Sequence, residues 1–193
     1  VMCEDLKEFL EEHGLKDPVI MGHSMGGKTA MKFAATYPQM LSKLIVVDIS
    51  TRYYKRHHDS ILSGLKSIDL KQLLSRQQAD ERLAKSEPDA GVRQFLLKNL
   101  YRTQNNEFDW RINLEVIDKN IDNVGEALPE NVSIRKPTLF IKGSKSKYIM
   151  EEDEKSIKKI FTDVKIETIE GAGHWVQAEK PQQVMESVKR FLT

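Results

Sequence analysis

Short apolar runs and helically spaced apolar positions alternate along much of the chain. Strands are predicted where apolar residues run together, at 19–21, 44–47, 138–141 and 164–169. Helices are predicted where apolar residues recur every three or four positions, over 2–13, 25–37, 150–161 and 181–192. The continuous β-branched run at 44–47 is typical of a strand buried on both faces, as in a parallel sheet. The alternation of strand and helix therefore indicates an α/β protein with a parallel sheet.

Residues 51–131 have a different pattern. They carry helical periodicities, for example Trp110, Leu114, Ile117 and Ile121, and no convincing strand. We therefore predict a core made of residues 1–50 and 132–193, and a helical lid or cap insertion made of residues 51–131. The residues outside the insertion suffice for about four strands at roughly 30 residues per βα unit.

Charge and composition exclude several classes of protein. The 193 residues contain 30 Lys and Arg against 29 Asp and Glu, so no net charge favours nucleic acid or anionic membrane. No apolar run approaches the roughly 18–20 residues of a membrane span. Cys3 is the only cysteine, which excludes a disulfide scaffold and a thiolate zinc site. We expect a cytoplasmic protein. Because Val1 opens directly into helix-like sequence, we also expect the natural N-terminus to lie elsewhere.

The segment GHSMGG at 22–27 carries the strongest chemical signal. It fits G-x-S-x-G between a predicted strand and a predicted helix, which is the setting of a nucleophile elbow. A tight turn there would expose the Ser24 hydroxyl, and small residues at 22 and 26 would let the backbone approach. The start of the helix would place the Met25 N–H beneath an oxyanion. The alternative is an ordinary glycine-rich turn.

A serine nucleophile needs a base, because its hydroxyl does not ionise at neutral pH. The chain has five histidines. His57 and His58 are adjacent, so they point in different directions on a helix and make a poor metal pair. His174 lies in the segment GAGHW at 171–175, after the last predicted strand, where a loop could place its imidazole over Ser24. We predict His174 as the base.

These motifs together resemble the α/β-hydrolase superfamily. More narrowly, the phrases VVDIS, GVRQFLLKNLYR, FIKGSKSKYI and GAGHWVQAEKP are similar to the small bacterial esterase and acyl-thioesterase group related to mitochondrial abhydrolase-domain esterases. The resemblance implies a hydrolase of carboxylic esters or acyl thioesters that needs no metal or cofactor. It also implies that the chain is the C-terminal part of a longer hydrolase, whose N-terminal part completes the sheet and the oxyanion hole.

The sequence departs from the superfamily pattern at the acid. The segment GSKSKY at 143–148 carries no carboxylate, and Ser146 stands where the acid is expected. A neutral hydroxyl cannot stabilise an imidazolium as a carboxylate does. Asp48, at the end of the preceding strand, is the best remaining candidate, and the narrower family resembles one with this relocated acid. The alternatives are a Ser24–His174 dyad or another carboxylate, among them Glu151, Asp153, Asp109 and Asp118.

The predicted reaction is acyl transfer through Ser24, His174 and Asp48, with the Met25 N–H at the oxyanion. The predicted substrate-binding residues are His23, Tyr53 and Trp175, although lid packing explains Tyr53 equally simply. A carboxylate at the elbow, as in haloalkane dehalogenases and epoxide hydrolases, is absent. Two alternatives stay open, a carbon–carbon bond hydrolase of the same fold and a non-catalytic binding protein that kept the fold.

Overall fold

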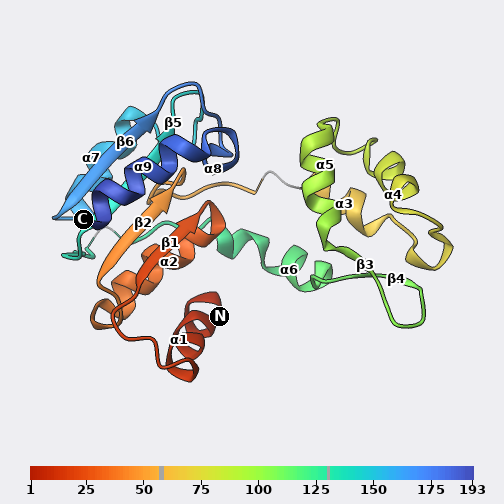
Figure 1. Cartoon of the computed structure of the whole chain (residues 1–193), viewed down its shortest axis with the longest axis horizontal. Coiled ribbons are helices and arrows are strands. Elements are labelled where there is room, and N and C mark those ends of the chain that lie inside the picture. The colour runs from red at the N-terminus through yellow and green to blue at the C-terminus, as the bar shows by residue number, and fades with distance from the viewer. Residues whose placement is uncertain (57–58, 130) are drawn as a thin grey trace. The chain divides into compact units, whose positions relative to one another are not determined.

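A computed structural model describes residues 1–56, 59–129 and 131–193 (Figure 1). The chain divides into two compact units. The first, called the core unit below, contains residues 1–54 and 124–193, and the second, called the insertion, contains residues 55–123.

The core unit is built on a four-stranded parallel sheet. Its strands are β1 (Val19–His23), β2 (Lys43–Val47), β5 (Thr138–Gly143) and β6 (Val164–Ile169), in the order β1-β2-β5-β6. The predicted α/β class, parallel sheet and strand positions are confirmed. The apolar runs form strands here because both faces of the sheet are covered, so no polar face is required.

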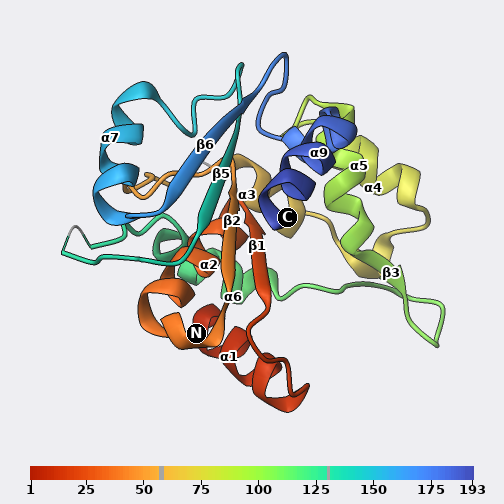
Figure 2. The same cartoon turned by 60° about the vertical axis from the view of Figure 1, so that its left-hand side comes forward.

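Helices cover the two faces of this sheet (Figure 2). Strand residues Leu44 and Val46 pack into one apolar cluster, with residues of α1 (Met2–Glu12), α2 (Met25–Thr36) and α7 (Glu151–Ile160). Their neighbours Ile45 and Val47 pack into a second cluster with the other helices, α8 (Val176–Glu179) and α9 (Pro181–Leu192). Successive side chains of a strand point to opposite faces, so this division follows from the strand itself.

The carboxyl ends of the strands bring the predicted site residues to one edge of the sheet. Ser24 directly follows β1, and Asp48 directly follows β2. The loop that carries His174 follows β6. Parallel strands all end at the same edge, and this edge is where open α/β sheets hold their ligands.

The insertion has its own apolar core. Its helices are α3 (Asp59–Lys66), α4 (Arg76–Leu83), α5 (Ala90–Leu96) and α6 (Leu114–Val124), joined by 3₁₀ turns η2 (Leu70–Gln72) and η3 (Leu97–Asn99). The core includes Leu65, Leu83, Leu97 and Leu100.

The prediction that 51–131 lacks strands was wrong. An antiparallel hairpin pairs β3 (Leu100–Arg102) with β4 (Phe108–Trp110). Each strand has three residues, too few for an alternating pattern to stand out from the helical spacing around it. Trp110, expected on a helical stripe, is the last residue of β4.

The predicted boundaries of the insertion were too wide. The Leu128 N–H donates to the Thr51 carbonyl at 2.8 Å, and the Tyr54 N–H donates to the Gly125 carbonyl at 2.8 Å. Because these hydrogen bonds tie 51–54 to 124–128, both segments belong to the core unit. A further helix follows the elbow helix, the short 3₁₀ turn η1 (Pro38–Met40).

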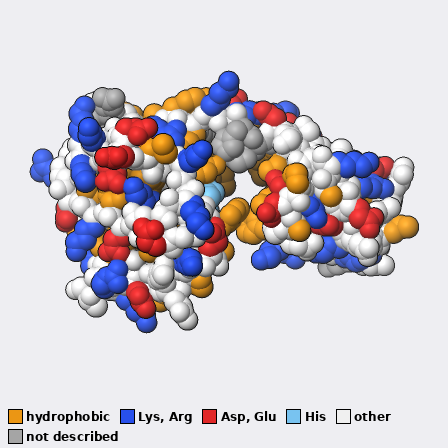
Figure 3. Space-filling model, turned by 90° about the horizontal axis from the view of Figure 1, so that it is seen from above, with side chains coloured by type: hydrophobic (Ala, Val, Ile, Leu, Met, Phe, Trp, Pro, Cys, Tyr) orange, Lys and Arg blue, Asp and Glu red, His pale blue; other side chains and the backbone are white. Residues whose placement is uncertain are grey.

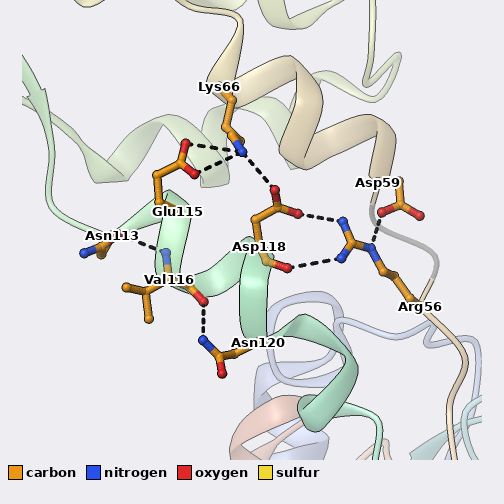
Figure 4. Close-up of polar contacts among 8 residues, drawn as sticks. All are labelled: Arg56, Asp59, Lys66, Asn113, Glu115, Val116, Asp118 and Asn120. Atoms are coloured by element: carbon orange, nitrogen blue, oxygen red, sulfur yellow. Dashed lines mark hydrogen bonds and ion pairs between the residues drawn. The ribbon is translucent and has the colours of Figure 1, made fainter.

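A network of charged side chains crosses the insertion (Figure 4). Asp118 of α6 receives a hydrogen bond of 2.6 Å from the Arg56 guanidinium and one of 2.8 Å from Lys66 Nζ. Arg56 also pairs with Asp59, and Lys66 with Glu115. The two cations hold the pKa of the Asp118 carboxyl below its usual value, first through hydrogen bonds and then through charge. The network therefore joins α6 to α3 and to the segment before it.

The surface seen in Figure 3 carries basic and acidic side chains interspersed, in keeping with the net charge of +1. Within the described part of the chain, none of the helices has both the length and the apolar character that crossing a bilayer requires.

Candidate functional site

Ser24 lies in a strained turn between β1 and α2. It is not a glycine, yet its φ of 52° is positive, a conformation that costs roughly 1–3 kcal/mol. Its N–H donates to the Val47 carbonyl of β2 at 3.0 Å, which fixes the turn to the neighbouring strand. The turn has the strand–turn–helix geometry expected of a nucleophile elbow, and α2 begins directly after the serine.

The glycines of the elbow differ in what they permit. A Cβ added at Gly22 would lie 2.2 Å from the Gly26 carbonyl oxygen, and one at Gly27 would lie 2.5 Å from Ile49 Cγ2. A Cβ at Gly26 would meet nothing within 4 Å. Small residues were expected at 22 and 26 for close approach. The positions with no room for a side chain are instead 22 and 27. At residue 26 it is the carbonyl oxygen, and not the Cα, that lies against Gly22.

Three side chains form a line of hydrogen bonds at this edge of the sheet. His174 Nε2 lies 3.0 Å from Ser24 Oγ, and His174 Nδ1 lies 2.8 Å from Asp48 Oδ2. The Asp48 side chain is fully buried, whereas that of His174 is 22% exposed. With Nδ1 protonated toward the carboxylate, Nε2 presents its lone pair to the serine hydroxyl. This arrangement can remove a proton from Ser24.

Asp48 is held by several backbone and side-chain contacts. Its φ is 49°, and its N–H donates to the Ile141 carbonyl of β5 at 2.8 Å. Its Oδ1 accepts the Gly143 N–H at 3.1 Å, and its Oδ2 accepts the Ser146 hydroxyl at 2.5 Å. These donors compensate the burial of a carboxylate, which is otherwise costly. Both oxygens are oriented before any substrate arrives.

Of the other candidate carboxylates, three are hydrogen-bonded elsewhere and one is exposed to solvent. Asp153 Oδ2 accepts the Met150 N–H at 2.8 Å, and Asp153 pairs with Arg52 at 3.1 Å. Asp109 accepts the N–H of Trp110, and Asp118 belongs to the charged network of the insertion. Glu151 is exposed in the first turn of α7. The His174 ring contacts Asp48 instead.

Comparison with known proteins identifies the family. Residues 1–130 match the family described as the alpha/beta hydrolase fold. The chain is a member of the α/β-hydrolase family. A solved structure titled "Marine microorganism esterase" is 39% identical, with a TM-score of 0.94, and the match covers 98% of this chain and 75% of that one.

Two named relatives of this α/β hydrolase come from a mouse and a bacterium. The "sn-1-specific diacylglycerol lipase ABHD11" of Mus musculus is 35% identical, over 99% of this chain and 64% of its own length. "Esterase YbfF" of Escherichia coli is 34% identical, over 99% of this chain and 73% of its own length. The chain thus spans just under two thirds of the mouse relative.

The predicted accessory residues of this α/β hydrolase have different surroundings. His23 Nε2 donates to the His174 carbonyl at 2.8 Å, and its ring lies 4.7 Å from that of His174. Burial lowers the pKa of His23, so its imidazole is neutral at pH 7. The Trp175 ring lies 5.9 Å from the His174 ring. Met25 opens α2, where an N–H has no helical partner.

Tyr53 is 55% exposed and makes none of the hydrogen bonds or ring contacts that join the described site residues. His57 and His58 lie outside the described residues. Among residues 1–56, 59–129 and 131–193, no group of three His, Cys, Asp or Glu is placed to hold a metal ion.

Sequence reasoning missed Tyr148, whose ring stacks on His174 with centroids 3.8 Å apart. It also noted Ser146 only as the residue that stands where an acid was expected, whereas the Ser146 hydroxyl donates to Asp48, the candidate acid. The only available signal was the position of both residues in the loop after β5, next to the strand that Asp48 follows.

Proposed function

We propose that the chain is a serine hydrolase that cleaves carboxylic esters or acyl thioesters, with Ser24, His174 and Asp48 as its catalytic triad. The line of hydrogen bonds from Ser24 Oγ through the His174 ring to Asp48 Oδ2 carries this proposal. The names of the relatives, an esterase and a lipase, support the substrate class.

Acylation would begin at Ser24. Its Oγ attacks the acyl carbonyl while His174 Nε2 takes the hydroxyl proton. The carbonyl oxygen becomes an oxyanion, which we place at the Met25 N–H and the positive end of α2. The tetrahedral intermediate then collapses, the bond to the alcohol or thiol breaks, and Nε2 returns its proton to that leaving group. An acyl-Ser24 ester remains.

Deacylation would repeat the same steps with water. His174 Nε2 takes a proton from water, and the resulting nucleophile attacks the acyl-Ser24 carbonyl. Collapse breaks the ester to Ser24 Oγ, which recovers the proton from Nε2, and releases the carboxylic acid. In both halves the imidazolium of His174 faces the buried Asp48 carboxylate, which stabilises its charge and holds its tautomer.

The substrate-binding roles of His23, Tyr53 and Trp175 remain predictions. Trp175 has support from its ring contact with His174. The hydrogen bond of His23 to the His174 carbonyl favours a role in holding the loop. The role of the insertion as a lid is likewise a prediction.

A fluorophosphonate probe tests the proposal on the full-length protein that contains this chain. We expect covalent labelling of Ser24 that is abolished in Ser24→Ala and strongly reduced in His174→Gln. Ser146→Ala, which keeps all three triad residues, should still label. No labelling of the folded full-length protein would overturn the proposal in favour of a non-catalytic binding protein.

A second measurement addresses the substrate class. We expect the labelled protein to hydrolyse p-nitrophenyl esters or acyl-coenzyme A thioesters. Labelling at Ser24 with turnover of neither panel would contradict the ester and thioester class and favour the carbon–carbon bond hydrolase.

A further inference from the structure

The ring of Tyr148 lies face to face with the ring of His174. Their centroids are 3.8 Å apart and their planes differ by 20°. This is the closest of the ring contacts described for His174, which also meets His23 at 4.7 Å and Trp175 at 5.9 Å. Tyr148 therefore covers one face of the imidazole that joins Ser24 to Asp48.

Tyr148 is itself fixed by its backbone and its ring. Its N–H donates to the Ser146 hydroxyl oxygen at 3.2 Å, and its carbonyl accepts the Tyr54 hydroxyl. The Tyr54 ring stacks on the Tyr148 ring at 5.5 Å, and the Tyr54 oxygen accepts the Ser50 N–H at 2.8 Å. Hydrogen bonds at its N–H and its carbonyl therefore fix the backbone of Tyr148, and the Tyr54 ring packs on its side chain.

Tyr54 is suited to this holding task. Burial, ahead of any other influence, raises the pKa of its hydroxyl to about 12, so the hydroxyl stays protonated and keeps donating to the Tyr148 carbonyl at neutral pH. The Arg52 guanidinium lies 4.1 Å from the centre of the Tyr54 ring. A stack of side chains, which we call the aromatic stack, therefore runs through Arg52, Tyr54, Tyr148 and His174.

We infer that Tyr148 is a positioning residue for His174: its ring holds the imidazole in the plane that joins Ser24 to Asp48, and its π face stabilises the imidazolium. The inference rests on the proposed function, because the imidazolium forms during acylation and deacylation.

Two physical effects support this role. A flat ring stacked on an imidazole opposes rotation about the Cβ–Cγ bond, and such rotation would move Nδ1 and Nε2 away from Asp48 and Ser24. An aromatic face also attracts a cation, and the attraction strengthens where water is excluded. Tyr148 is half-buried beside a fully buried Asp48, so the contact lies in a poorly hydrated place.

The titration of His174 tests the inference without requiring turnover. Within the described part of the chain, the ionisable groups that contact the His174 ring are Asp48, His23 and Tyr148. The ring protons of His174 would be followed by nuclear magnetic resonance in the full-length protein, and assigned by their loss in His174→Gln. We expect the His174 signals of Tyr148→Leu to change at lower pH than those of the wild type, because the cation loses its aromatic partner. Tyr148→Phe, which keeps the face, should restore the wild-type value.

A matched control is Tyr37→Leu, which removes a tyrosine at the end of α2 that packs on Phe33. It should leave the His174 titration unchanged. Thermal unfolding of each variant checks that it is folded. An unchanged His174 titration in folded Tyr148→Leu would overturn the inference, as would equal effects of Leu and Phe.

Kinetics provides a second readout. With a p-nitrophenyl ester we expect Tyr148→Leu to lower kcat about 10-fold and to change KM little, with Tyr148→Phe near wild type. A change confined to KM would assign Tyr148 to substrate binding and contradict the positioning role. If the fluorophosphonate labels nothing, the proposed function fails, while the titration still decides whether Tyr148 controls the imidazole.

Discussion

The Ser146 hydroxyl donates a hydrogen bond of 2.5 Å to Asp48 Oδ2, the oxygen that also faces His174 Nδ1. The position where the superfamily pattern places the acid thus supplies a hydrogen-bond donor to Asp48, the proposed acid, which follows another strand. Ser146 follows β5 and Asp48 follows β2, and these two strands are neighbours in the sheet. The Ser146 hydroxyl and the His174 ring therefore meet at the same carboxylate oxygen.

Replacing Asp48 tests its assignment as the acid. We expect Asp48→Asn to lower kcat on the order of 10⁴-fold, because the imidazolium loses its negative partner and the wrong tautomer is favoured. The measurement is ester turnover with Glu151→Gln as the control, since Glu151 is an exposed carboxylate outside the hydrogen-bonded line. Near-normal turnover of folded Asp48→Asn would show that the acid lies elsewhere or that a dyad suffices.

The geometry of Ser146 also predicts a rescue. Adding Ser146→Asp to Asp48→Asn places a carboxylate within reach of His174 Nδ1, so part of the lost turnover should return. Ser146→Asp alone should lower activity, because it places two carboxylates at one hydrogen-bonding position. A double variant no more active than Asp48→Asn would mean that Ser146 approaches only the acid and not the imidazole.

The elbow glycines predict opposite outcomes for one substitution. Gly22→Ala should destabilise the chain by about 1–3 kcal/mol, because its Cβ would meet the Gly26 carbonyl at 2.2 Å and neither backbone can give way cheaply. Gly26→Ala should leave stability equal or raise it, because its Cβ meets nothing and alanine favours the helix. Urea unfolding of both variants decides the matter. Equal destabilisation would contradict this account of the turn.

Because of Lys28, we expect the stability of the core unit to depend on pH. Its Nζ donates to the Arg52 carbonyl at 2.5 Å and to the Glu126 carbonyl at 2.9 Å, where the chain leaves and re-enters the core unit. Burial, with a smaller contribution from Arg52, lowers its pKa to about 8, while Asp153 opposes the shift. The unfolded chain, with a pKa near 10.5, therefore binds more protons than the folded chain between pH 8 and 10.5.

The sign of the effect follows from this difference in bound protons. The contribution of Lys28 to stability rises as the pH increases from about 8 to 10.5 and is constant below about 8, where Lys28 is protonated in both the folded and the unfolded chain. Unfolding free energies of wild type and Lys28→Met, measured at pH 7, 9 and 10.5, should diverge in favour of the wild type as the pH rises. A constant difference would show that Lys28 keeps its ordinary pKa in the folded chain.

The charged network of the insertion is expected to weaken in acid. Asp118 has a lowered pKa, so its contribution is complete above about pH 4 and is lost as the pH falls through its folded value. Asp118→Asn should increase hydrogen exchange in α3 and α6 at pH 7 and low salt, and much less in high salt. Asp109→Asn, outside the network, is the control. Equal exchange in the two variants would show that the ion pairs do not hold α6.

The sequence predicted the core unit well for a physical reason. Its strands are short apolar runs between helices, and burial on both faces leaves them little alternative. Ser24 and His174 were predictable because the elbow motif and the loop after β6 are local in sequence. The hairpin of the insertion was not predictable, because each of its strands has only three residues, too few to show an alternating apolar pattern in the sequence. Tyr148 could not be predicted either, because its stacking on His174 joins residues far apart in the sequence, and no local sequence pattern indicates such a contact.

The backbone bonds of Ser24 and Asp48 have a consequence for engineering. The Ser24 N–H is held by the Val47 carbonyl of β2, and the Asp48 N–H by the Ile141 carbonyl of β5. Each residue is thus anchored to the next strand of the sheet, so the pairing of the strands sets the distance between positions 24 and 48. A side chain of different chemistry, such as a thiol at position 24, could be exchanged on this scaffold without moving its neighbours. A one-residue deletion within β2 would displace both anchors together.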